Sequence, residues 1–241
     1  MLLQSLLLIA GGYLLGSVSP TYVIGRWLAG KDLRQYGSGT LSGSMVFEHV
    51  GRWAVVPVVL FDVLKGTVPA LLALWLDLGV QVAAAAGLAA AVGHNWPIFL
   101  RFYGGRGMGT FAGVWLALFP PGLVWMAGFM GIGWRLGDSG PLLYPCLLTL
   151  PLLARLFNGP KMLGAFLLGG PELAGQLAGA MILITLVKRL EANRRPRPPR
   201  GPERLKVILR RAFLDRDIAS HEAWIRRQPG AEDAKESTAS G

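Results

Sequence analysis

Long stretches without charge constrain this chain more than any other feature of its sequence. No charged residue precedes Arg26, and the four later uncharged segments are 78–100, 107–134, 139–154 and 173–187. A helix that crosses a bilayer needs about 20 mostly apolar residues, and several of these segments reach or approach that length. Soluble domains carry about 25% charged residues, whereas this chain has 16% and a mean hydropathy of +0.45. The pattern predicts an all-α, polytopic membrane protein.

Seven transmembrane helices are expected from these runs. We place them at 2–25, 53–74, 80–100, 108–120, 122–134, 140–154 and 172–187. The segment 155–171 is the least regular, and we expect it to be partly re-entrant. Signal peptides carry their positive charge before the apolar region, but here the first basic residue, Arg26, follows it. We therefore expect the first run to be retained as a helix.

Lys and Arg in short loops indicate the orientation, because such residues are retained on the cytoplasmic side. Connectors one, three and five are basic, with Arg26, Lys31, Arg34 and Arg52, then Arg101 and Arg106, then Arg135. Connectors two and four have no basic residue, whereas connector six departs from the pattern with Arg155 and Lys161. The balance predicts an outside N-terminus and a cytoplasmic C-terminus.

The C-terminal part is expected to be soluble and basic. From Lys188 onward it holds 14 of the 24 Lys and Arg residues, and RRPRPPR at 194–200 is typical of a stiff spacer. Residues at helical spacing then predict an amphipathic helix with an apolar face (Leu205, Ile208, Leu209, Ala212 and Phe213) flanked by Arg204, Arg210 and Arg211. This helix is expected either to lie on anionic lipid headgroups or to pack on the protein's own cytoplasmic face. The composition of 230–241 is typical of disorder.

The overall charge of +10 is explained by attraction to a membrane surface, so we expect no nucleic-acid partner. The single cysteine, Cys146, excludes an intrachain disulfide and a multi-cysteine metal site.

Three cytoplasmic connectors are rich in glycine and in hydroxyl or basic residues. They contain YGSGTLSGS at 36–44, RFYGGRGMGTFAG at 101–113 and RLGDSGP at 135–141. Glycine permits sharp turns that expose successive N–H groups to an anion, and arginine adds a planar fork of donors suited to phosphate. Gly104, Gly105, Arg106 and Gly107 are therefore candidates to cradle a phosphate. The alternative is a flexible basic turn, because GGRGMG matches neither a Walker A loop nor a dinucleotide fingerprint.

Ionisable residues also lie inside the apolar spans. Asp62 and Lys65 are three residues apart on one predicted helix face, where charged groups are costly and usually paired or functional. They are expected either to form a structural ion pair or to take part in the site. His94 is the only histidine within a predicted span, and its candidate roles are general base or a structural hydrogen bond.

Several segments, in order, carry a family resemblance. They are GSVSPTYVIGRWLAG at 16–30, YGSGTLSGSMVF at 36–47, FDVLKG at 61–66, GHNWPIFLRFYGGRGMGT at 93–110 and KRLEAN at 188–193. Together they resemble the bacterial acyl-phosphate:glycerol-3-phosphate acyltransferase family over roughly residues 5 to 195. The resemblance implies seven transmembrane helices in the bacterial inner membrane, with the motifs meeting on the cytoplasmic side.

The implied reaction transfers a fatty acyl group from acyl phosphate to the 1-hydroxyl of glycerol 3-phosphate, giving lysophosphatidic acid for phospholipid synthesis. The resemblance implies that this reaction requires no metal and no other cofactor. We expect a transmembrane domain at 1–188 and a basic cytoplasmic tail at 189–241. The expected partners are the two phosphate substrates, the bilayer and, for the tail, anionic headgroups. Two alternative functions are a lipid-binding or regulatory paralogue with little activity, and a small carrier of anionic solutes.

The resemblance also implies roles for individual residues. Ser38 and Gly39 would help form the phosphate site, Arg106 would clamp a phosphate, Asn193 would close the pocket, and His94 and Thr110 would support the second motif. The catalytic set is thus Ser38, His94, Arg106 and Asn193. The substrate- and phosphate-binding set is Gly37, Gly39, Ser44, Lys65, Gly104, Gly105, Gly107, Thr110 and Ser139.

The chain departs from the family pattern at several motif positions. The two asparagines of the first motif are Thr40 and Met45 here, and its final arginine is Glu48. The lysine of the second motif is Arg106, which keeps the charge and changes the geometry. In the last motif, histidine and arginine are replaced by Leu190 and Glu191.

Overall fold

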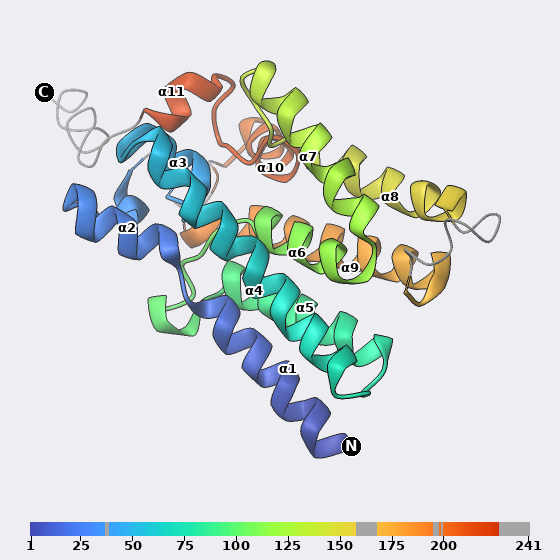
Figure 1. Ribbon diagram of the computed structural model, residues 1–241. Coiled ribbons are helices and arrows are strands. Elements are labelled where there is room, and N and C mark those ends of the chain that lie inside the picture. Colours follow the sequence, from blue (N-terminus) through green and yellow to red (C-terminus); the bar gives the residue numbers. More distant parts are fainter. Residues whose placement is uncertain (37–38, 158–167, 195–197, 199, 227–241) are drawn as a thin grey trace, which may run out of the picture.

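The computed structural model describes residues 1–36, 39–157, 168–194, 198 and 200–226, and this part of the chain consists of helices joined by turns and loops, with no strand (Figure 1). The prediction of an all-α protein is confirmed. The α-helices are α1 (Leu2–Ser17), α2 (Pro20–Ala29), α3 (Gly43–His49), α4 (Val55–Trp75), α5 (Val80–Asn95), α6 (Met108–Leu118), α7 (Pro120–Arg135), α8 (Leu143–Phe157), α9 (Gly170–Glu191), α10 (Glu203–Leu214) and α11 (His221–Ile225). The short 3-10 turns are η1 (Leu33–Gln35), η2 (Arg52–Ala54), η3 (Ile98–Leu100) and η5 (Ala192–Arg194).

Four segments of the described chain are long and apolar enough to cross a membrane. They are Leu2–Ala29, Arg52–Trp75, Val80–Leu100 and Gly170–Glu191. The helices α6 and α8 are also apolar but shorter, and α7 has 16 residues. Helices of this length and composition are those of an integral membrane protein.

The first span differs from the single helix expected at 2–25. Val18 is extended, with φ −73° and ψ 120°, and separates α1 from α2. A new helix begins here because the side chain of Ser19 accepts a hydrogen bond from the Tyr22 N–H at 3.3 Å and Pro20 takes the first helical position. Both residues are typical of helix starts. The Val18 carbonyl at this break accepts a hydrogen bond from Lys65 Nζ at 3.3 Å.

Other helix boundaries in the structure differ by a few residues from those expected from the sequence. The expected span 108–120 ends at Leu118, and Pro120 and Pro121, expected at its boundary with the span 122–134, open α7. Phe119 alone separates α6 from α7. Proline fits the first turn of a helix because the N–H groups there have no intrahelical acceptor. The last membrane helix continues past 187 to Glu191, so that Lys188 and Arg189 are helical. The re-entrant segment expected at 155–171 lies largely outside the described residues.

Glycines bring the central helices into close contact. A Cβ at Gly16 of α1 would overlap the backbone of Ala90 in α5, and a Cβ at Gly113 of α6 would overlap the Val63 carbonyl oxygen in α4. Small residues permit such backbone approach, which is how membrane helices gain packing energy. The tight α4–α6 contact fixes where α6 begins, and the glycine-rich loop before α6 is fixed with it.

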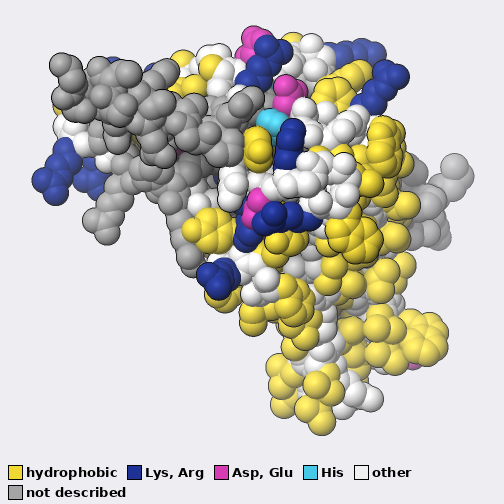
Figure 2. Space-filling view, turned by 90° about the vertical axis from the view of Figure 1, so that its left-hand side faces the viewer, with side chains coloured by type: hydrophobic (Ala, Val, Ile, Leu, Met, Phe, Trp, Pro, Cys, Tyr) yellow, Lys and Arg dark blue, Asp and Glu magenta, His cyan; other side chains and the backbone are white. Residues whose placement is uncertain are grey.

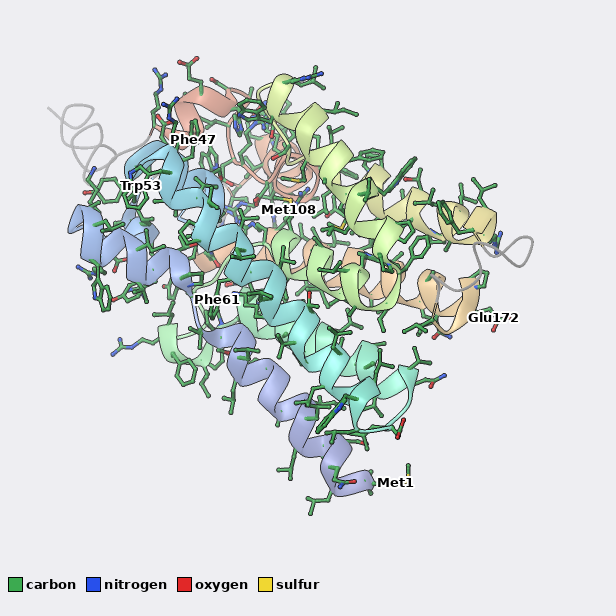
Figure 3. All side chains as sticks on the ribbon, in the orientation of Figure 1. Met1, Phe47, Trp53, Phe61, Met108 and Glu172 are labelled. Atoms are coloured by element: carbon green, nitrogen blue, oxygen red, sulfur yellow. The ribbon has the colours of Figure 1, made fainter. Side chains whose placement is uncertain are left out.

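Charge is distributed unevenly over the molecule. In Figure 2, apolar side chains cover the lower part of the visible face, and the Lys, Arg, Asp, Glu and His side chains gather in the upper half. Figure 3 shows Met1 at the end opposite Phe47 and Trp53, which lie beside α3 and the start of α4. Phe47 and Trp53 are 50% and 64% exposed. The apolar end and the polar end of the bundle are thus distinct.

The predicted tail helix is present as α10, and it packs on the protein itself. Tyr144 of α8 donates a hydrogen bond to the Ala212 carbonyl at 3.0 Å, and Arg189 of α9 donates to the same carbonyl at 3.2 Å. Leu205, Leu209 and Phe213 nevertheless remain exposed. Of the proposed spacer at 194–200, residues 195–197 and 199 lie outside the described part, as does the segment 230–241.

Candidate functional site

The second motif turns sharply between α5 and α6. Its glycines are required by the close approach of other segments: a Cβ at Gly104 would overlap the His94 carbonyl oxygen, and one at Gly105 would overlap the His94 ring. The Gly105 N–H donates to the His94 carbonyl at 3.1 Å. At Gly107, φ is +74°, the left-handed region that glycine adopts without strain. The loop therefore folds back over the end of α5 before entering α6.

Three of the expected segments converge at this loop. The Leu41 N–H, from the first motif, donates to the Gly104 carbonyl at 3.3 Å. The Asn193 side-chain amide donates to the carbonyls of Gly39 and Gly104 at 3.0 and 3.1 Å. Asn193 is in the left-handed region, with φ 48°, which asparagine tolerates better than most residues. The end of α9 therefore joins the first and second motifs.

Arg106 is buried at the centre of this junction, with 4% of its surface exposed. Its Nε donates to Asp215 Oδ2 at 2.6 Å, and its Nη1 donates to the Lys188 carbonyl at 3.4 Å. Its Nη2 has no hydrogen-bond partner among the described residues. An unpaired buried donor on a charged group is costly, so this nitrogen is a candidate ligand for an anion.

Two further cations come from the last turn of α9. Lys188 Nζ lies 2.9 Å from Glu191 Oε2 and donates to the Phe102 carbonyl at 3.3 Å. Arg189 donates to the Gly140 carbonyl at 2.6 Å, and its hydrogen bonds within the described chain go to backbone carbonyls. Sequence reasoning assigned no role to Lys188 or Arg189. These two adjacent basic residues follow an apolar stretch, a pattern that indicates the end of a membrane span.

The ionisable residues of α4 and α5 form a connected group. Asp62 Oδ1 lies 2.8 Å from Lys65 Nζ and 3.4 Å from His94 Nδ1. The expected ion pair between Asp62 and Lys65 is therefore present, and Lys65 also holds the break between α1 and α2. The carboxylate lies on the Nδ1 side of the His94 ring, while the Nε2 side contacts Gly105. This group contacts the second-motif loop where the His94 ring packs against Gly105.

The junction is electropositive. Four buried cations (Lys65, Arg106, Lys188 and Arg189) face three carboxylates that pair with them (Asp62, Glu191 and Asp215) in the described chain. An excess of positive charge within low-dielectric walls attracts anions. The chemistry that fits is the binding of a phosphorylated molecule.

The remaining predicted residues take different places. Gly37 and Ser38 lie outside the described residues. Ser44 is exposed, and its hydroxyl is 2.9 Å from that of Ser42, which is 3.2 Å from the hydroxyl of Thr40. Thr110 is fully buried in the first turn of α6 against Gly66. Ser139 packs against Gly133 in the turn after α7, next to the Gly140 carbonyl that Arg189 binds.

An ion-pair cluster joins the first connector to the end of α2. Asp32 accepts hydrogen bonds from the Arg34 side chain at 2.9 and 2.7 Å and lies 3.2 Å from Arg26 Nη2. The Arg34 hydrogen bonds hold the pKa of the Asp32 carboxyl below its ordinary value. Glu48 is at the position where the family pattern has arginine, and its Oε1 lies 3.7 Å from Nε of Arg226, the residue that follows α11.

Comparisons with known proteins agree with this arrangement. A family model described as glycerol-3-phosphate acyltransferase matches residues 6–191. Glycerol-3-phosphate acyltransferase 4 of Dehalococcoides mccartyi (strain CBDB1) is 35% identical over 94% of this chain and 95% of its own length. A glycerol-3-phosphate acyltransferase of Synechococcus sp. (strain CC9902) is 47% identical over 55% of this chain and 66% of its own length.

Two solved structures are also similar. Both are of PlsY (YgiH), an integral membrane glycerol 3-phosphate acyltransferase. The glycerol 3-phosphate form has a TM-score of 0.66 at 29% identity, covering 78% of this chain and 89% of that one. The lysophosphatidic acid form has a TM-score of 0.60 at 25% identity, covering 86% and 98%. The helical bundle is thus that of an integral membrane acyltransferase. The chain belongs to the glycerol-3-phosphate acyltransferase family.

Proposed function

We propose that this protein transfers an acyl group from acyl phosphate to the 1-hydroxyl of glycerol 3-phosphate, giving lysophosphatidic acid for phospholipid synthesis. The observation that carries the proposal is Arg106, buried where the first motif, the second motif and the end of α9 meet, with Nη2 unpaired among the described residues. Both substrates bear a phosphate, which a guanidinium binds well.

In the proposed step, the glycerol oxygen forms a bond to the acyl carbon. The bond between that carbon and the phosphate oxygen breaks, the phosphate leaves with the electron pair, and the hydroxyl proton passes to it. Holding two phosphorylated substrates in attack geometry supplies much of the rate. Fixed positive donors near the leaving phosphate stabilise the charge that develops there. This reaction needs neither a metal nor another cofactor.

The proposed residue roles follow from the contacts. Arg106 clamps a phosphate, and Asn193 holds the two motif loops together through Gly39 and Gly104. His94 packs against Gly105, and Asp62 holds the His94 ring in place. Ser38 contributes to the phosphate site with Gly39, by resemblance. Gly37 is assigned to the same site by resemblance alone. Of the other members of the predicted set, Gly105 and Gly107 shape the second-motif loop, and Ser44, Lys65, Thr110 and Ser139 lie in the segments around the junction.

A reconstituted assay tests this function. Purified protein should release phosphate from palmitoyl phosphate only when glycerol 3-phosphate is present, and lysophosphatidic acid should appear in equal amount. Release without the acceptor would indicate hydrolysis. Accumulation of unchanged glycerol 3-phosphate inside proteoliposomes, without chemistry, would indicate a carrier, and acyl-chain binding without turnover would indicate a lipid-binding paralogue.

We also propose that the chain crosses the bacterial inner membrane seven times, with the N-terminus outside and both the site and the tail in the cytoplasm. The basic connectors support this orientation. We divide the chain into a membrane domain at 1–188 and a tail at 189–241. The tail helix α10 exposes Leu205, Leu209 and Phe213 and also the basic residues Arg204 and Lys206, a pattern suited to contact with anionic lipid headgroups.

Limited trypsin digestion tests both proposals. Trypsin should remove the tail in inverted inner-membrane vesicles and spare it in intact spheroplasts, and the reverse result would contradict the orientation. In proteoliposomes, cleavage after Arg204 and Lys206 should be slower with phosphatidylglycerol present than with phosphatidylcholine alone. Equal cleavage rates in the two lipids would rule out the headgroup contact.

A further inference from the structure

Asp215 is a residue of the tail whose side chain lies at the centre of the candidate site, beside Arg106. This residue lies beyond the segment matched by the family model, which ends at residue 191. Its carboxylate nevertheless lies 2.6 Å from Arg106 Nε. Asp215 ends α10 with φ 58°, in the left-handed region, so the chain turns there and presents the side chain to the core.

The residues on both sides of Asp215 are bound to α9 and to the loop after α7. Arg189 donates to the Phe213 carbonyl at 3.0 Å, just before Asp215. Arg216, the next residue, forms an ion pair with Asp138 of the loop after α7. Because these anchors flank it, the position of Asp215 is set by the core rather than by the tail alone.

The three guanidinium nitrogens of Arg106 are used unequally. Asp215 holds Nε, the Lys188 carbonyl accepts from Nη1, and Nη2 remains without a partner in the described chain. Two fixed contacts determine the plane of the guanidinium group and the direction of the third nitrogen. A carboxylate standing in for a phosphate would be expected to take two donors of the fork, whereas the contact found here involves one.

We propose that Asp215 is a positioning residue that orients Arg106 so that Nη2 points at the substrate phosphate. The tail is then part of the active site. This inference rests on the proposed role of Arg106 as a phosphate ligand. Misplacing a binding group by about 1 Å can cost about 100-fold in rate, so an effect of this size is expected from a residue that does not itself touch the substrate.

The test compares Asp215→Asn with Glu203→Gln. Asparagine keeps the size and tolerates the left-handed backbone, while Glu203 lies at the other end of α10 and pairs only with exposed Lys206 among the described residues. We expect Asp215→Asn to lower kcat/KM roughly 10- to 100-fold, through a higher KM for the substrate whose phosphate Arg106 holds. Glu203→Gln should match the wild type in activity and in melting temperature in detergent. Asp215→Asn should lower the melting temperature, because it removes the carboxylate that pairs with buried Arg106, so kcat/KM is compared at a temperature at which all variants remain folded.

A double-mutant cycle distinguishes positioning from a merely structural role. In an Arg106→Lys background no guanidinium remains to orient, so Asp215→Asn should change kcat/KM less than about twofold. Equal losses in both backgrounds would overturn the proposal, and so would an Asp215→Asn variant as active as the wild type or faster, which would make Asp215 a competitor of the phosphate. An inactive wild-type protein would instead refute the proposed function.

Discussion

Arg106→Ala is expected to lower kcat/KM for acyl transfer by about a thousandfold. Removing one fixed donor from a developing oxyanion costs roughly 100- to 1,000-fold, and this substitution also removes a buried positive charge from the anion site. The measurement is steady-state release of phosphate from palmitoyl phosphate with glycerol 3-phosphate as acceptor. Arg106→Lys should fall between the wild type and alanine, because an ammonium keeps the charge without the planar fork.

Loss of activity in Arg106→Ala must be separated from loss of structure. The alanine variant leaves the Asp215 carboxylate without its 2.6 Å partner in a largely buried position, and breaking a buried ion pair costs about 3–5 kcal/mol of stability. The double variant Arg106→Ala with Asp215→Asn also removes the charge of this carboxylate. It should regain thermal stability while remaining inactive. Recovery of activity in the double variant would contradict a direct role for Arg106.

Gly113→Ala is expected to destabilise the fold strongly for so small a change. The added methyl group would overlap the Val63 carbonyl oxygen of α4, and the Gly113 carbonyl is itself bound by Thr67 Oγ1 at 2.9 Å. Forcing an extra carbon into a packed contact costs about 1–3 kcal/mol. For a chain of this size that corresponds to a melting temperature lower by roughly 2–12 °C, measured on purified protein in one detergent.

Gly128→Ala provides the matched control for that experiment. Gly128 lies within α7, and a Cβ there meets no atom within 4 Å. Alanine is the better helix former by roughly 1 kcal/mol, so this variant should melt at the wild-type temperature or slightly above it. If both alanine variants melt alike, the close approach of α4 and α6 does not limit stability.

The helical fold was predictable from the sequence because hydropathy acts locally. The backbone N–H and C=O groups of each apolar run need hydrogen-bond partners within the bilayer, where there is no water. A helix supplies these partners within its own segment. The break between α1 and α2 was missed for a related reason. Ser19 and Pro20 carried the signal for a new helix, but the apolar run continues across them, so hydropathy alone did not reveal it.

The candidate site was only partly predictable. The glycines of the second motif and Arg106 were found because their residue types suggest phosphate binding. Asp215 was not found, because its contact with Arg106 joins residues 109 positions apart and depends on how the tail docks. Lys188 and Arg189 resembled an ordinary end of a membrane helix, and only the fold shows that both are buried.

The pair of Asp62 and Lys65 has a consequence for how the protein is made. Each charge alone would raise the free energy of inserting α4 by roughly 2.5–3.5 kcal/mol. Because the two side chains lie on one helix and 2.8 Å apart, each charge in α4 has its counter-ion within the same helix when that helix leaves the translocon. Insertion of α4 into the lipid therefore does not require contact with α5, the helix that contains His94 and is synthesised later.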